Sequence, residues 1–269
     1  MPYVLIIYSS IYVSVGVPNL NVKLLGFLPG LTTPGGVTHQ AIDDVALMRS
    51  IPNMRILECA DATDVESVLD VAYEVDGPVY VRMLRGEVPR LFPLTEPMNF
   101  GVVRMLSEGL DLVIVTAGIC TQEALKVAHV LKQAGIQVTH LHLSTISPFP
   151  TDVVVAAASD SRYGVITMEN HSIVGGIGSA TAEALSEACV GKRLVRLGVA
   201  GVYAHGASRE YLMSEYGLDS VALAGAIGQL LDRTDLMDLL DEHNNKTKNH
   251  IPQHQASAEA QKMERPEDL

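Results

Sequence analysis

The chain has 269 residues, 48% of them hydrophobic, which is enough for two domains with apolar cores and excludes a disordered or fibrous protein. Its 31 acidic and 19 basic residues give a formal net charge of -12. This charge argues against nucleic acid or an anionic membrane as the main partner, and favours a small molecule or another protein. The three cysteines form no C-x-x-C pair, which favours a reduced, cytoplasmic compartment.

The first 17 residues, MPYVLIIYSSIYVSVGV, carry no charge, so a membrane segment has to be considered. They lack a basic region and a small-residue cleavage site, and proline and serine interrupt a run that is barely of spanning length. We therefore expect a buried strand or helix of a domain whose beginning is missing, and no membrane partner.

From residue 21 to residue 83, short apolar runs alternate with helical patterns: NVKLLG, DDVALMRS, MRILE, a longer helix and VYVRM. This alternation predicts a parallel α/β domain over residues 1–92. The longer helix is expected to open at Thr63, with Glu66 completing a capping box. Its apolar face, which should pack on the sheet, comprises Val65, Val68, Leu69 and Ala72.

Prolines at positions 89, 93 and 97 break this pattern and predict an interdomain linker over residues 93–108. A second alternation follows: DLVIVTAG, a helix over 121–133, QVTHLHL, a helix near 152–158, GVITMEN, a helix over 177–188, RLVRLGV and two further helical stretches. It predicts a second α/β domain over residues 109–240. Residues 241–269 are polar and are expected to form a disordered tail. The predicted fold class is therefore two open, mostly parallel α/β domains.

The loop TTPGGVTHQ, residues 32–40, lies between a predicted strand and a helix, where open parallel sheets place ligands. Pro34, Gly35 and Gly36 allow a tight backbone, and His39 would face the crevice. His39 is therefore a candidate site residue, although a histidine at a helix start can also be a cap or a hydrogen-bonding core residue.

Arg85 follows the strand VYVRM, again at the carboxyl end of a strand. A guanidinium there can hold a phosphate or a carboxylate through two parallel hydrogen bonds. Arg82 lies nearby in the sequence. Either arginine could instead be a surface charge or part of an interface ion pair.

The segment ENHSIVGGIGSA, residues 169–180, leads from a strand into a helix whose N-terminus could cradle an anion. Thr181 stands where a dinucleotide fingerprint needs a third glycine, and close packing of the helix on the strand explains these glycines equally well. His140 and His142 share one face of a strand, but no third ligand is near in sequence. We expect them to be ordinary strand residues.

The runs GVTHQAIDDVALMR, IPNM, ADAT and DGPVYVR resemble the later part of the pyrimidine-binding domain of transketolases. The runs DLVIVTAG, TMENHSIVGGIGSA and YGLD resemble the C-terminal domain of two-subunit transketolases and their deoxyxylulose-phosphate-synthase relatives. The similarity covers about residues 18–232. It implies a partial thiamine-diphosphate pyrimidine-binding domain followed by a transketolase C-terminal domain.

The resemblance implies an enzyme that uses thiamine diphosphate and Mg²⁺ to transfer a two-carbon ketol unit between sugar phosphates. It implies that His39 is a catalytic and substrate-binding residue that hydrogen-bonds the sugar near the reacting carbon, and that Arg85 binds the sugar phosphate. It further implies an N-terminal transketolase subunit as partner, with homodimerisation within a heterotetramer.

Three departures from the family pattern limit what is carried over. Gly35 stands where many transketolases have a substrate-binding aspartate, and Leu28 stands where a histidine is usual. The cofactor-activating glutamate and the aromatic residues that stack on the aminopyrimidine belong upstream of the matching region, and a separate domain holds the diphosphate and magnesium. We therefore expect the cofactor-binding residues to lie upstream of this chain or on the partner, and no metal ligands within the chain.

The leading hypothesis is the C-terminal subunit of a split transketolase that is inactive without its N-terminal partner. The alternative is a catalytically inactive remnant or assembly module of a transketolase-like complex. A deoxyxylulose-phosphate-synthase or ketoacid-dehydrogenase-like component is a third interpretation, and the run THQAIDDVALMR favours transketolase over it.

Overall fold

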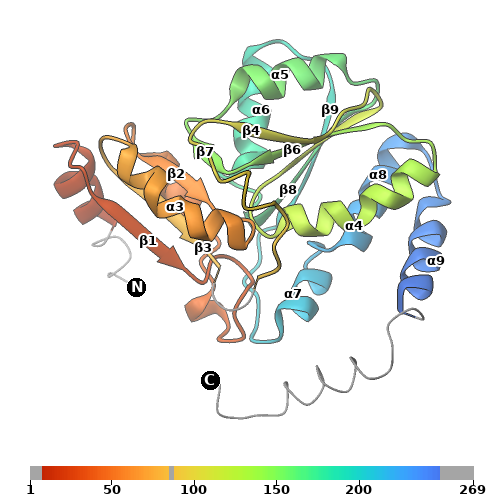
Figure 1. Ribbon diagram of the computed structural model, residues 1–269, viewed down its shortest axis with the longest axis horizontal. Helices are drawn as coiled ribbons and strands as arrows, with labels where there is room; N and C mark the ends of the chain where they lie inside the picture. Colours follow the sequence, from red (N-terminus) through yellow and green to blue (C-terminus); the bar gives the residue numbers. More distant parts are fainter. Residues whose placement is uncertain (1–7, 85–87, 249–269) are drawn as a thin grey trace.

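The computed structural model describes residues 8–84 and 88–248, which form two adjoining sheets (Figure 1). The first sheet has the order β1-β3-β2-β7, built from β1 (Lys23–Phe27), β2 (Arg55–Glu58), β3 (Val79–Met83) and β7 (Thr145–Ser147). The second has the order β4-β6-β5-β8-β9, built from β4 (Val103–Ser107), β5 (Leu112–Thr116), β6 (Val138–Leu143), β8 (Gly164–Ser172) and β9 (Arg193–Val199). Among the described strands, only β7 and β4 pair antiparallel to their neighbours, so the predicted fold class is confirmed.

Helices cover these sheets in the order that the alternating pattern predicts. The first half contains the π-helical turn η1 (Tyr12–Gly16), the 3₁₀ turn η2 (Val37–His39), α2 (Asp44–Arg49) and α3 (Ala62–Glu74). The second half contains α4 (Cys120–Gln133), α5 (Thr151–Asp160), α6 (Ile177–Glu187), α7 (Arg209–Glu215), α8 (Ser220–Leu231) and α9 (Leu236–Lys248). In Figure 1, α5 and α6 lie on one side of the second sheet, and α4 and α8 lie on the other.

One apolar core is shared by the two halves. It joins Ile56 and Tyr80 of the first sheet to Val113 and Leu141 of the second, beneath α5 and α6. A separate core fills the opposite face of the second sheet under α4, α8 and α9, and a small one lies under α3. The two halves therefore form one packed body, and the first half depends on the second for part of its core.

Two predicted boundaries differ from the structure. Within the expected linker 93–108, residues 103–107 form β4, which pairs antiparallel with β6 and makes one edge of the second sheet. Within the expected tail 241–269, residues 241–248 continue helix α9, and residues 249–269 lie outside the described residues. The local sequence of β4 and of the end of α9 shows no clear strand or helix pattern. Pairing or packing with distant segments stabilises these elements.

The N-terminal apolar segment and α3 also differ from expectation. Of η1 only Gly16 is buried, whereas Val13 and Val17 are exposed, so the expected buried element is not seen in residues 8–17. In α3 the N-cap is Asp61, whose side chain accepts from the Asp64 amide, and not Thr63. On the predicted apolar face of α3, Val68 and Ala72 are buried while Val65 and Leu69 are exposed. No helix in the described part of the chain is long and apolar enough to cross a membrane.

Candidate functional site

The loop after β1 is anchored to the second half of the chain. Asn170, at the carboxyl end of β8, accepts from the Leu31 amide at 2.8 Å and donates from its amide group to the Pro29 carbonyl at 3.1 Å. Within the loop, the Gly30 amide donates to the Ala41 carbonyl at 2.7 Å. Leu28 begins this turn with a positive φ of 60°, an unfavourable backbone conformation that these surrounding contacts hold in place.

His39 ends the 3₁₀ turn η2 and its side chain is exposed. The Thr38 hydroxyl lies 2.9 Å from Nδ1 of the His39 ring. When this hydroxyl donates, a neutral ring carries its proton on Nε2, which is then the nitrogen available to a ligand. The structure thus gives His39 an anchored backbone and an accessible ring, and not a place in the core.

Gln40 connects the His39 loop to the other half of the chain. Its side chain is buried, and Nε2 donates to the carbonyls of Thr33 and His205, each at 3.2 Å. Its Oε1 atom is buried without a hydrogen-bond partner among the described residues. The backbone of Gly206 lies against Pro34 and Gly36, so the loops before η2 and before α7 are in contact.

Arg82 is the buried cation at the junction of the two halves. The side chain is 1% exposed, with Nε 2.8 Å from Asp44 Oδ2 and Nη1 2.6 Å from Glu58 Oε1. Nη2 donates to the Asn170 carbonyl at 2.8 Å. Arg82 is therefore neither a surface charge nor free for a ligand. Arg85, the other candidate, lies outside the described residues.

Burial and charge act against each other on the partners of Arg82. Burial raises the pKa of Glu58, and the Arg82 guanidinium offsets only part of that rise. For Asp44, burial acts in the same direction, but the charge and hydrogen bonds of Arg82 outweigh it and lower the pKa. The two carboxylates in turn raise the pKa of Arg82 despite its burial, so the arginine stays charged.

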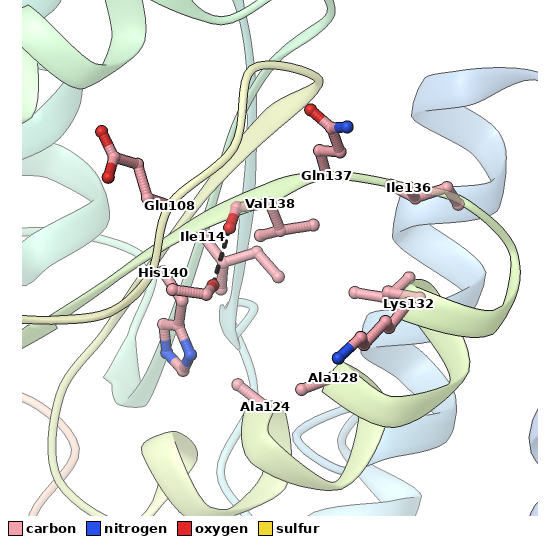
Figure 2. Close-up of a pocket in the computed structure, with 11 residues that line it drawn as sticks. Glu108, Ile114, Ala124, Ala128, Lys132, Ile136, Gln137, Val138 and His140 are labelled. Atoms are coloured by element: carbon pink, nitrogen blue, oxygen red, sulfur yellow. Dashed lines mark hydrogen bonds between the residues drawn. The ribbon is translucent and has the colours of Figure 1, made fainter.

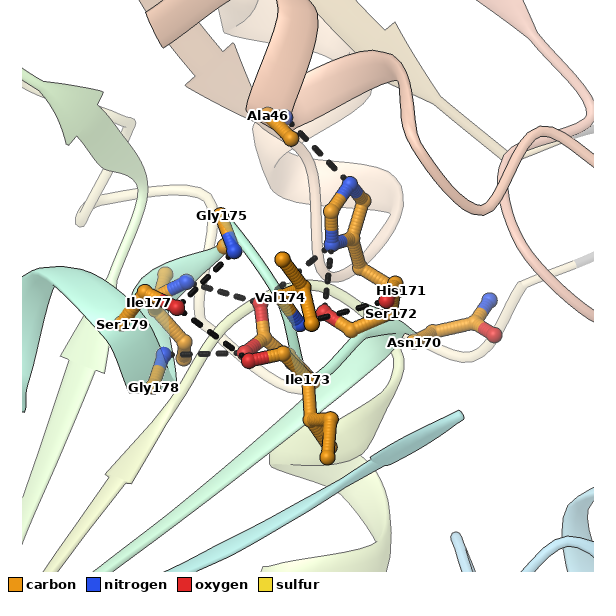
Figure 3. A network of polar contacts seen from close by, with 12 residues as sticks. Ala46, Asn170, His171, Ser172, Ile173, Val174, Gly175, Ile177, Gly178 and Ser179 are labelled. Carbon is orange, nitrogen blue, oxygen red and sulfur yellow. Dashed lines mark hydrogen bonds and ion pairs between the residues drawn. The ribbon is translucent and has the colours of Figure 1, made fainter. Parts of the chain in front are cut away.

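The glycine-rich segment after β8 holds a carboxyl group that belongs to the chain itself (Figure 3). Glu169 accepts from the Ile177 amide at 2.7 Å and from the Gly178 amide at 2.9 Å, at the N-terminus of α6. A Cβ at Gly176 would lie 1.8 Å from the Glu169 carboxylate, so close packing explains this glycine. Burial raises the pKa of Glu169 to about 7, although the two amides favour the ionised form.

His171 links β8 to helix α2 as a neutral ring (Figure 3). Its Nδ1 donates to the Ser172 carbonyl at 2.7 Å, and its Nε2 accepts from the Ala46 amide at 3.4 Å. One donor and one acceptor fit the neutral imidazole. Burial, with the nearby Arg82 charge, lowers the pKa of His171 to about 4, so the ring is uncharged at neutral pH.

His140 and His142 are strand residues on one face of β6, as predicted, and a chain of hydroxyl groups connects them. His140 Nε2 lies 2.8 Å from the Thr116 hydroxyl, which lies 2.9 Å from the Thr121 hydroxyl. The Thr121 hydroxyl lies 2.8 Å from His142 Nδ1. The far end of this chain, His142 Nε2, is 3.7 Å from Asp64 Oδ2 on α3.

Local sequence carries only partial signals for the residues that build this junction. Gln40 and Asn170 lie inside the runs THQ and MENH, but nothing local indicates which carbonyl or amide each one reaches. Glu169 lies eight residues before the amide that it caps, beyond the reach of a local capping motif. Of the predicted site residues, only His39 is brought to the exposed side of this junction by the described structure.

Two domain families match this chain. The transketolase pyrimidine binding domain matches residues 1–90, and the transketolase C-terminal domain matches residues 101–223. The solved structure "Split gene transketolase, inactive beta4 tetramer" superposes with a TM-score of 0.77 and 35% identity, covering 84% of this chain and 72% of that chain.

Curated relatives give the same result. A 6-deoxy-6-sulfo-D-fructose transketolase subunit from Clostridium sp. is 34% identical over 84% of this chain and 70% of its own length. A subunit of an apulose-4-phosphate transketolase from Actinobacillus succinogenes is 32% identical over 79% of this chain and 68% of its own length. The chain spans 66–70% of the length of four such relatives. The domain matches and these identities show that the chain belongs to the transketolase family.

Proposed function

We propose that this chain is the C-terminal subunit of a thiamine-diphosphate-dependent transketolase, which transfers a two-carbon ketol unit between sugar phosphates together with an N-terminal subunit. The observation that carries the proposal is the exposed His39 ring on a loop that Asn170 and Gln40 anchor. Relatives named as transketolase subunits support the two-subunit arrangement.

In this proposal His39 hydrogen-bonds the sugar near the carbon whose bonds change. A neutral ring that accepts from Thr38 at Nδ1 can donate from Nε2 to a substrate oxygen. Such a donor accelerates the reaction when its bond strengthens as charge develops on that oxygen. The anchored loop contributes by keeping the ring in place, which reduces the entropy lost on binding.

Arg85 is proposed to bind the substrate phosphate. Its neighbour Arg82 is fully used by two buried carboxylates, so it is not a second candidate for this role. A guanidinium forms two parallel charge-assisted hydrogen bonds with a phosphate. Arg85 would then select phosphorylated over unphosphorylated sugars.

The described residues do not fit the diphosphate and magnesium of the cofactor. They contain no group of three or more His, Cys, Asp or Glu side chains that could hold a metal ion. The N-terminus of α6, which could have received a phosphate, is filled by the Glu169 carboxylate. We therefore propose that the partner holds that end of the cofactor, and that this chain alone neither binds it tightly nor transfers a ketol unit.

The same proposal includes the assembly and its place in the cell. Two copies of this chain would associate with two N-terminal subunits in a cytoplasmic heterotetramer. The solved relative is described as an inactive beta4 tetramer of a split gene transketolase, which supports self-association of such chains and the need for a partner in catalysis.

Reconstitution with an N-terminal transketolase subunit, assayed for ketol transfer from a ketose phosphate to an aldose phosphate, tests the proposal. We expect activity only in the mixture, and no binding of thiamine diphosphate with Mg²⁺ by this chain alone in calorimetric titration. His39→Ala should lower kcat by about 10- to 1,000-fold in the mixture. Arg85→Ala should raise KM for phosphorylated sugars more than for unphosphorylated ones.

The competing function is an assembly module without catalysis. It is favoured by Gly35 and Leu28, which occupy positions where the resemblance implies a substrate-binding aspartate and a histidine. A mixture that assembles but transfers no ketol unit with any phosphorylated sugar tested would support this second function. Ketol transfer by the isolated chain would contradict both.

A further inference from the structure

A cavity of about 360 Å³ lies in the second half of the chain, between α4 and the edge of the sheet formed by β6 and β4 (Figure 2). Its walls are mainly apolar and come from Ile114, Ala124, Leu131, Ile136 and Val138. Small side chains on α4 leave the space, because Ala124 and Ala128 face it where larger residues would fill it. The volume falls within the range of small-molecule sites.

A buried polar group lines the inner part of this cavity. His140 is 4% exposed and lines the wall, with Nε2 held by the Thr116 hydroxyl at 2.8 Å. The imidazole is thus a polar group on the inner wall of the cavity, and it can form a hydrogen bond with a polar atom of a ligand.

The opening of the cavity carries a cation. Lys132 on α4 extends its ammonium group across the opening in Figure 2, and it forms no ion pair within the described ranges. Lys126, one to two turns earlier on the same helix, is by contrast paired with Glu123 at 2.5 Å. Glu108 lies on the far side of the opening, and Figure 2 shows its carboxylate directed away from Lys132.

We propose that this cavity binds a small carboxylic acid with an apolar body. The apolar body would lie against Ile114, Leu131 and Val138, the carboxylate would meet the Lys132 ammonium, and a polar group within the cavity would be bonded by His140. The site does not share residues with the His39 loop, and the proposal does not depend on ketol transfer. Its inner end connects to the first half through the hydroxyl chain from His140 to His142, which ends 3.7 Å from Asp64.

Three probes with one apolar body and different end groups test the proposal on the full chain: 3-phenylpropionate, 3-phenylpropan-1-ol and 3-phenylpropylamine. Binding is followed by backbone amide shifts in NMR titrations. For a ligand of this size we expect the acid to bind with a dissociation constant on the order of 1 mM. The alcohol should bind about two- to fivefold more weakly, since it lacks a partly screened charge contact, and the amine more weakly still.

Variants locate the site and its charge. Lys132→Gln should bring the affinity of the acid down to that of the alcohol, whereas the matched Lys126→Gln should leave both unchanged. Ala128→Leu should abolish binding of all probes, because the larger side chain fills the opening. Ala128 is exposed, so this variant is expected to fold, and circular dichroism checks that it does.

Each other result overturns the proposal. If no probe gives saturable shifts, or if the shifts avoid the amides of Ile136 and Val138, the cavity is not the site. If the acid binds no better than the amine, or if Lys132→Gln has no effect, the preference for a carboxylate is wrong. If Ala128→Leu fails to fold, the positions of the shifted amides and the probe affinities of Lys132→Gln still test the proposal.

Discussion

The central strands β3 and β5 of the two sheets are fully buried, whereas the edge strand β1 of the first sheet is partly exposed. In the second sheet every residue of β5 is buried, because helices cover both faces. In the first sheet the edge strand β1 leaves Leu25 44% exposed and Phe27 61% exposed. Both residues lie next to β3 on the face that carries α3. Strands buried on both faces are typical of a parallel sheet that helices cover on both sides, whereas an exposed apolar edge strand is typical of a surface that binds another chain.

The difference shows what each half needs for stability. The second half covers its own central strands. The first half receives β7 and part of its core from the second, and its buried Arg82 is bonded to the Asn170 carbonyl at the end of β8. We therefore expect substitutions at the junction of the two halves to lower the stability of the whole protein. Substitutions on the β1 face, which we define by the exposed Leu25 and Phe27, should instead affect association with other chains.

The largest effect is expected for Arg82→Met. The variant keeps much of the side-chain volume but leaves the Asp44 and Glu58 carboxylates buried without their cation, which should cost about 3–5 kcal/mol of unfolding free energy. Chemical denaturation measures it. The matched control is Arg162→Met, whose ion pair with Asp111 is exposed on the arginine side and should cost at most about 1 kcal/mol. Equal losses of unfolding free energy in the two variants would show that the buried ion pairs of Arg82 stabilise the protein no more than an exposed ion pair does.

The next effect depends on pH and concerns Glu169, on the well-covered second sheet. Burial raises its pKa to about 7 from 4.5. The unfolded chain therefore releases this proton first as the pH rises, so the contribution of Glu169 to stability should fall between about pH 4.5 and 7, by on the order of 3 kcal/mol.

Glu169→Gln isolates this contribution, because glutamine does not titrate. The difference in unfolding free energy between wild type and Glu169→Gln should therefore change with pH over that window in favour of the variant. Denaturation curves at several pH values provide the measurement. A difference that stays constant across this window would mean that Glu169 remains ionised in the folded protein.

A smaller effect is expected for Asn170→Ala, which removes the two hydrogen bonds that hold the loop after β1. Leaving a buried amide and a buried carbonyl without partners should cost about 1–3 kcal/mol. The Leu31 amide should then exchange its hydrogen faster. Asn99→Ala is the control, since Asn99 is exposed and its side chain donates to the nearby Pro97 carbonyl. Unchanged protection of Leu31 would contradict the anchoring role of Asn170.

The smallest effect on stability is expected on the β1 face. Leu25→Lys and Phe27→Lys replace exposed side chains, so the unfolding free energy should change by no more than about 0.5 kcal/mol. Self-association of the chain, measured by sedimentation, should nevertheless weaken, because each variant places a lysine charge on the apolar β1 face. Val174→Lys makes the same change at an exposed position of the second half and should not weaken association. If all three variants sediment alike, the β1 face is not an interface.

The sequence by itself determined the succession of strands and helices and hence the fold class. Runs such as DLVIVTAG and VYVRM are largely apolar, and the structure buries them as β5 and β3. The alternation of His140 and His142 on one face of β6 was equally readable, because a strand has a period of two. These features depend on neighbours within a few residues, which is the range over which a pattern carries information.

The sequence was less informative at the ends of elements. Thr63 and Glu66 fit a capping box, but Asp61 caps α3, and the Thr63 hydroxyl donates to the Phe92 carbonyl 29 residues away. Strand β4 was expected to be linker, because its pairing with β6 is what makes it a strand. In both cases a contact with a distant segment outweighs the local preference.

Only the tertiary structure decided which polar side chains are free for a ligand. Arg82, Glu169 and Asn170 have the side-chain chemistry of binding residues, yet each is occupied by partners in the same protein. Their partners lie up to 141 residues away in the sequence. The exposed ring of His39 and the cavity beside His140 arise in the same way, since burial and free space depend on how separate segments pack and not on the residues next to them.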